Sequence, residues 1–129
     1  FEKKKARYKG ILERLNKAQA LLPKARPAVA PRGRGEFDYL NSKLKMHEHL
    51  LDSILHLNTA FIQCHEAFGH RESDRAKVLE LLDAMKDSLD RAYESAIKTG
   101  EEHVRYCDHP SDLGVLSFIN GGHIAHAQE

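Results

Sequence analysis

Residues 36 to 68 read "EFDYLNSKLKMHEHLLDSILHLNTAFIQCHEAF", and this stretch decides the fold. Its large apolar residues recur every three or four positions, at Leu50, Ile54, Leu57, Phe61, Cys64 and Phe68. This spacing predicts one amphipathic helix over residues 36–69, with these residues as the apolar seam that faces the core. Gly69 suits the end of such a helix. At 1.5 Å per residue the helix spans roughly 50 Å.

A second periodic stretch follows directly and predicts a helix of similar length over residues 74–107. Its apolar positions are Val78, Leu82, Met85, Leu89, Tyr93, Ala96, Gly100, Val104 and Cys107. Either Ser73 or Asp74 can cap its first turn. Two long helices joined by a short turn predict an antiparallel hairpin over residues 36–107. With the turn near residue 71 or 72, facing positions have residue numbers that sum to about 143.

The remaining segments add two shorter helices. A stripe of Tyr8, Ile11, Leu15, Ala18 and Leu22 predicts a helix over residues 1–22 that stops before Pro23. Residues 23–35, "PKARPAVAPRGRG", contain three prolines and two glycines and predict an extended, basic linker. Residues 111–120 are predicted to form a short final helix after Pro110. We therefore expect an all-α fold, an up-down-up bundle of three helices with a short fourth helix, as one domain over residues 1–129.

Composition and charge exclude several classes of protein. The chain is 41% hydrophobic and 30% charged, with no Trp, which is typical of a soluble helical protein and not of a disordered one. No apolar run reaches the roughly 20 residues that a membrane span needs. Residues 1–35 carry 11 Lys or Arg against two acids, while the remaining residues are net acidic. Stacking aromatics are scarce in the basic segment and no RNA or DNA motif is present, so we expect no nucleic-acid partner. Because an apolar run is lacking, we also expect no membrane partner.

Five of the nine histidines lie between residues 47 and 70, which raises the question of a metal site. Helical angles place His47 and His65 on the apolar arc, where we expect them to be shielded, and His49 and His56 on the wet face. His49, Asp52 and His56 are spaced i, i+3, i+7 and are the only candidate metal ligands. A straight helix cannot direct both of these histidines at one ion without ligands from elsewhere. We therefore predict no metal and no cofactor.

Other residues that can carry chemistry also have structural explanations. Cys64 and Cys107 fall at opposite ends of the hairpin and are interpreted as buried thiols, which favours a reducing compartment. An acidic stripe of the third helix should point outward; its members are Glu80, Asp83, Asp87, Asp90, Glu94 and Glu101. We expect the basic first helix or the linker to lie near it. Because no phosphate loop, catalytic triad or zinc motif occurs, we expect this segment not to be an enzyme.

Three phrases carry a family resemblance: "RYKGILERLNKAQALLPKA", "PRGRGEFDYLNSKLKMHEHLLDSILHLNTAF" and "DHPSDLGVLSFIN". In this order they resemble the helical region C-terminal to the catalytic barrel of large bacterial glycoside hydrolases. The resemblance covers nearly the whole chain. It implies an accessory domain that supports a barrel or mediates oligomerisation. It implies no catalytic residue here, because the catalytic carboxylates of those enzymes sit on barrel strands.

Three functional hypotheses follow. The first is a non-catalytic helical accessory or assembly module of a larger, carbohydrate-active enzyme, whose partners are other domains of its parent, a protein partner or a second copy. The second is a free-standing helical adaptor that binds a protein partner. The third is a small metal-binding helical bundle. The chain begins at Phe1 without a signal-peptide pattern, and we interpret it as a segment of a larger protein.

Overall fold

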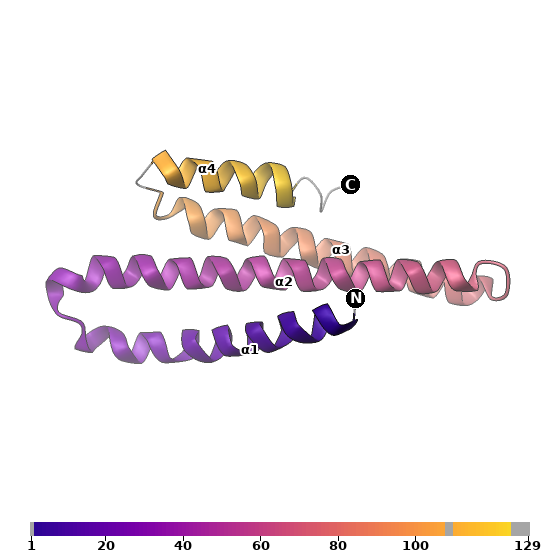
Figure 1. Cartoon of the computed structure of the whole chain (residues 1–129), viewed down its shortest axis with the longest axis horizontal. Coiled ribbons are helices and arrows are strands. Elements are labelled where there is room, and N and C mark those ends of the chain that lie inside the picture. Colours follow the sequence, from indigo (N-terminus) through magenta and orange to yellow (C-terminus); the bar gives the residue numbers. More distant parts are fainter. Residues whose placement is uncertain (1, 108–109, 125–129) are drawn as a thin grey trace.

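The computed structural model describes residues 2–107 and 110–124, and within them it contains helices and no strand. The four α-helices are α1 (Glu2–Ala25), α2 (Arg34–His70), α3 (Arg75–Val104) and α4 (Pro110–Phe118), and a π-helical segment, Ile119–Ile124, follows α4. Figure 1 shows the chain reversing direction at each connection, so that α1, α2 and α3 run up, down and up. The predicted all-α class and its up-down-up order are confirmed.

The connection between α1 and α2 consists mostly of helical turns, with extended backbone at Val29, so the prediction of an extended linker over residues 23–35 is largely wrong. α1 continues through Pro23 to Ala25, because a proline in the last turn removes only one backbone hydrogen bond. Two short 3-10 turns, Arg26–Ala28 and Pro31–Gly33, then lead into α2. Each has a proline in its first turn, where the fixed φ angle suits a helical turn.

The predicted hairpin of α2 and α3 is confirmed. Asp74, rather than Ser73, caps α3, and its carboxylate accepts a hydrogen bond of 2.9 Å from the backbone N–H of Lys77. α3 ends at Val104, three residues earlier than predicted, where two i→i+3 hydrogen bonds tighten the chain into a turn. The hydroxyl of Ser53 donates to the carbonyl of Ala92 at 2.7 Å. These residue numbers sum to 145, within two of the predicted register.

The seam between α2 and α3 consists mainly of small residues. The buried residues of α2 are Ser42, Met46, Ser53, Ala60 and Ala67, and those of α3 are Leu81, Ser88, Ala92, Ser95, Ala96, Thr99, Gly100, Glu102 and His103. Four of these positions on each helix repeat every seven residues, the period that keeps a seam facing its partner in a coiled coil. Short side chains at the contact let the helices approach closely. The predicted seam of large residues is therefore wrong, because Phe61, Cys64 and Phe68 are exposed.

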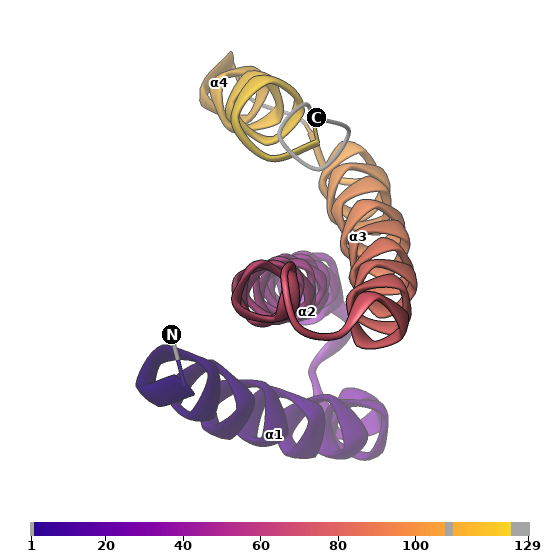
Figure 2. The same ribbon diagram turned by 90° about the vertical axis from the view of Figure 1, so that its right-hand side faces the viewer.

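α4 extends the hairpin on one side of α3. A methyl group at Gly100 would lie 3.9 Å from the side chain of Ile124 and 4.0 Å from that of Ile119. α4 lies along the half of α3 that is distant from the α2–α3 turn (Figure 1). Viewed from its end, the molecule is an open arc in which α1, α2, α3 and α4 follow one another (Figure 2). The half of the hairpin near the turn therefore has no helix over its α4-facing side.

Candidate functional site

Of the candidate metal ligands His49, Asp52 and His56, Asp52 and His56 lie beside α3 and not on an open wet face. The carboxylate of Asp52 accepts a 2.6 Å hydrogen bond from the hydroxyl of Ser95 and lies 3.7 Å from Nε2 of His56. His49 and His56 are half-buried. In the described part of the chain, no three His, Cys, Asp or Glu side chains are grouped as a metal site requires. The position of Asp52 is explained by its contact with α3.

The predicted shielding of His47 and His65 is wrong, because both are exposed. The error has the same cause as the misplaced seam. Since small residues of α2 face α3, the helix is rotated away from the orientation that burying the large residues would require. This rotation moves His47 and His65 to the surface, leaves His49 half-buried and brings His56 to the flank of α3. Cys64, interpreted as a buried thiol, is likewise exposed, and Cys107 is half-buried.

A buried polar cluster joins α2, α3 and α4, and sequence reasoning did not find it. Nε2 of His103 lies 2.8 Å from the backbone carbonyl of Asp112, and because a carbonyl only accepts, this nitrogen carries the proton. Nδ1 of a neutral ring then accepts from the ammonium of Lys43 at 3.1 Å. Lys43 also lies 3.5 Å from the Asp112 carboxylate and 5.1 Å from the ring centroid of Tyr39.

A second pair of polar residues completes this junction. The hydroxyl of Ser42 lies 2.7 Å from the carboxylate of Glu102 and 3.1 Å from its backbone carbonyl. Arg105 lies 3.1 Å from the other carboxylate oxygen of Glu102. Buried polar groups that satisfy one another in this way fix the packing of helices. The junction is therefore best explained as the structural lock that holds α4 against the hairpin.

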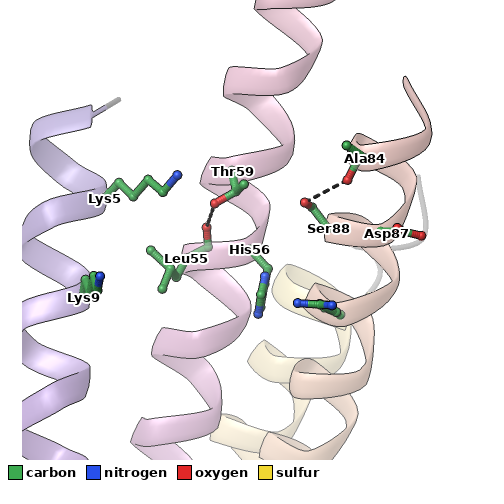
Figure 3. A pocket seen from close by; sticks show the side chains of 9 residues that line it. Lys5, Lys9, Leu55, His56, Thr59, Ala84, Asp87 and Ser88 are labelled. Carbon is green, nitrogen blue, oxygen red and sulfur yellow. Dashed lines mark hydrogen bonds between the residues drawn. The ribbon is translucent and has the colours of Figure 1, made fainter. Parts of the chain in front are cut away.

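A groove that carries several charged side chains lies on the other side of the hairpin, where α2 runs between α1 and α3 (Figure 3). Its volume is about 420 Å³. Lys5 and Lys9 of α1 and Arg91 of α3 bring three cationic side chains to it, and Asp87 brings one carboxylate. Asp87 belongs to the predicted acidic stripe, all of whose members are exposed as expected. The basic first helix therefore approaches this stripe at Asp87.

An apolar strip lies on the hairpin beside the small-residue seam. We define it as the large apolar residues of one face of α2 and α3, which are Ile54, Leu57, Phe61, Phe68, Leu82, Met85 and Leu89. Helical angles and the antiparallel register place all seven on the same side of the hairpin. Phe61 is 61% exposed, Phe68 is 65% exposed and Leu82 is 39% exposed. Solvent therefore reaches much of the strip's apolar area.

Comparisons with protein-family models, with curated proteins and with solved structures find no match to this chain. The resemblance to the helical regions of glycoside hydrolases therefore stays a hypothesis. No helix among the described residues has the length and apolar character that crossing a membrane requires.

Proposed function

We propose that this chain is a non-catalytic helical assembly module that pairs with a second copy of itself through the apolar strip. The exposure of Phe61, Phe68 and Leu82 carries this proposal. Large apolar side chains that line one face of a hairpin are stabilised when another surface removes them from water. The small residues of the seam cannot cover the strip, because they are already buried between α2 and α3.

The size of the strip suits a protein interface. A phenylalanine buries about 150–250 Å² in a packed environment. At their observed exposures, Phe61 and Phe68 leave on the order of 250 Å² accessible. A standard interface buries about 800 Å² on each partner. These two rings would thus supply about a third of that area, and the rest of the strip would add to it.

The charges of the chain favour a second copy as the partner. The formal net charge is only +1, so two copies do not repel each other strongly. Each copy also has surfaces of opposite sign, because α1 exposes lysines and arginines while α3 exposes the acidic stripe. Pairing around a two-fold axis uses the same patch on both copies, which fits a single apolar strip.

Pairing of this kind agrees with the wider role that the resemblance implies. An assembly module of a larger carbohydrate-active enzyme would join two catalytic subunits through such a strip. This part of the proposal rests on the resemblance alone. A free-standing adaptor would use the same strip to bind a different protein.

Sedimentation equilibrium of the whole chain tests the proposal. We expect a monomer–dimer equilibrium at micromolar concentrations and a monomer when Phe68→Ser and Leu82→Ser are combined. Leu21→Ser is the matched control, because Leu21 is 62% exposed but lies on α1, and this variant should still dimerise. A wild-type chain that remains monomeric up to about 0.1 mM would contradict the proposal. Equal loss of dimer in the control variant would show that the strip is not the interface.

A further inference from the structure

The groove between α1 and α3 contains cations whose arrangement the proposed assembly role does not explain. Figure 3 shows Lys5 extending from α1 toward Thr59 of α2, and His56 lying between α2 and α3. Arg91 lines the groove from α3. The groove is thus formed by residues of three consecutive helices, from Lys5 in α1 to Arg91 in α3. Its volume of about 420 Å³ falls within the range of roughly 300–1,000 Å³ that is common for small-molecule sites.

The three cationic side chains of the groove form no ion pair within the described part of the chain. None of Lys5, Lys9, Arg91 and Asp87 forms an ion pair there, whereas other lysines of α3 do: Lys77 pairs with Glu80 at 2.8 Å and Lys86 with Asp90 at 2.7 Å. With His56 neutral, three positive charges and one negative charge leave the groove with a formal charge of +2. Like charges held near one another attract a multivalent anion.

The hydroxyl groups of the groove are not free to donate hydrogen bonds to a ligand. Thr59 donates its hydroxyl hydrogen to the carbonyl of Leu55 at 2.9 Å, and Ser88 lies 3.0 Å from the carbonyl of Ala84, as Figure 3 shows. These hydrogen atoms are already used within the protein, so the side-chain donors left for an anion are the ammonium and guanidinium groups and the imidazole of His56. Leu55 and Ala84 also supply apolar surface within the groove.

We propose that this groove binds a small molecule that carries a phosphate or sulfate ester. The ester would sit between the ammonium groups of Lys5 and Lys9 and the guanidinium of Arg91, a group well suited to pairing with such anions. The body of the molecule would lie against Leu55 and Ala84. Asp87 is the single carboxylate of the groove and opposes the binding of an anion.

Isothermal titration of the whole chain with inorganic pyrophosphate at 0.15 M salt tests the charge requirement. We expect Lys9→Ala and Arg91→Ala each to weaken binding about five-fold, because each removes one attractive charge. Asp87→Asn should strengthen binding by a similar factor, because it removes the opposing charge. Lys17→Ala is the matched control. Lys17 is exposed on α1 and lies eight residues, about 12 Å, beyond Lys9, which exceeds the Debye length of about 8 Å.

Amide NMR spectra recorded during the same titration locate the bound anion. Shifts at Thr59 and Ser88, with Lys17→Ala binding like the wild type, would support a defined site. Equal weakening by Lys9→Ala and Lys17→Ala, or shifts confined to α1, would show general attraction of anions to a basic helix and overturn the proposal. Absence of pyrophosphate binding, or weaker binding by Asp87→Asn, would also overturn it. Circular dichroism of each variant shows whether the fold is retained.

Discussion

The ammonium of Lys43 lies 3.1 Å from Nδ1 of His103, and this contact links α2 to the last turn of α3. The opposite ring nitrogen of His103 donates to the backbone carbonyl of Asp112 in α4. One imidazole ring therefore joins three helices. His103 is 2% exposed, so solvent water cannot easily replace either of its hydrogen bonds.

We expect His103→Ala to lower the free energy of unfolding by about 2–4 kcal/mol, because it leaves a cavity and removes a hydrogen-bond partner from Lys43. Urea denaturation measures this loss. His65→Ala is the control, since His65 is exposed and its loss should cost less than about 0.5 kcal/mol. Relative to the wild type, His103→Ala should accelerate amide hydrogen exchange more in α4 than in α1. Similar stability of the two variants would show that the lock contributes little.

The small-residue seam gives a second prediction. Ala92 is fully buried, and its carbonyl accepts the hydrogen bond from Ser53. Ala92→Leu should destabilise the chain by about 2–4 kcal/mol, because the larger side chain must push α2 and α3 apart. Leu82→Ala, on the exposed strip, should cost less than about 1 kcal/mol. Thermal unfolding monitored by circular dichroism ranks the two variants, and the reverse order would mean that the large residues form the core.

That reverse order is what the sequence alone predicts, and the contrast shows where periodicity fails. Both faces of α2 repeat at helical spacing, so periodicity identifies the helix, its length and its antiparallel register. It does not decide which face meets α3. Ser53 and Ala60 contribute little apolar surface, yet their short side chains allow the two helices to approach closely. Hydrophobicity alone therefore assigns large residues such as Phe68 to the core, where the structure has the small residues.

The candidate site was less predictable than the fold. The cluster of Lys43, His103 and Asp112 draws on residues up to 69 positions apart, and none of them belongs to a recognisable motif. Lys9 and Arg91 likewise line one groove only because α1 folds back along α2. The acidic stripe, in contrast, could be predicted, because charged residues on one face of a helix usually remain in solvent. Sites that form only when three helices pack together could be found only in the structure.

The start of α3 gives a prediction with a closely matched control. Asp74 accepts the hydrogen bond from the backbone N–H of Lys77, whereas the hydroxyl of the adjacent Ser73 lies 3.4 Å from the carbonyl of His70. We expect Asp74→Ala to cost about 1 kcal/mol of unfolding free energy and Ser73→Ala less than about 0.5 kcal/mol. Urea denaturation of the two variants measures this difference. A larger loss for Ser73→Ala would mean that Ser73, and not Asp74, caps α3.

The connection between α1 and α2 should make stability depend on pH. Arg26 binds both carboxylate oxygens of Asp38, at 2.8 and 2.7 Å. The hydrogen bond from Arg26, followed by the attraction of its charge, lowers the pKa of Asp38 below its ordinary value. A group whose pKa is lower in the folded state contributes stability above its unfolded pKa. This contribution is lost as the pH falls through the folded value.

Thermal unfolding of the wild type and of Asp38→Asn from neutral to acidic pH tests this linkage. The wild type should be the more stable protein at neutral pH, and the difference should shrink as the pH falls below about 4, the ordinary pKa that aspartate has in the unfolded chain. Asp83→Asn is the control, because Asp83 is exposed and forms no ion pair in the described part of the chain. Its unfolding temperature should follow that of the wild type across the same range. A stability difference for Asp38→Asn that does not change with pH would mean that the contact with Arg26 acts through packing, and that its charge has no part in holding α1 to α2.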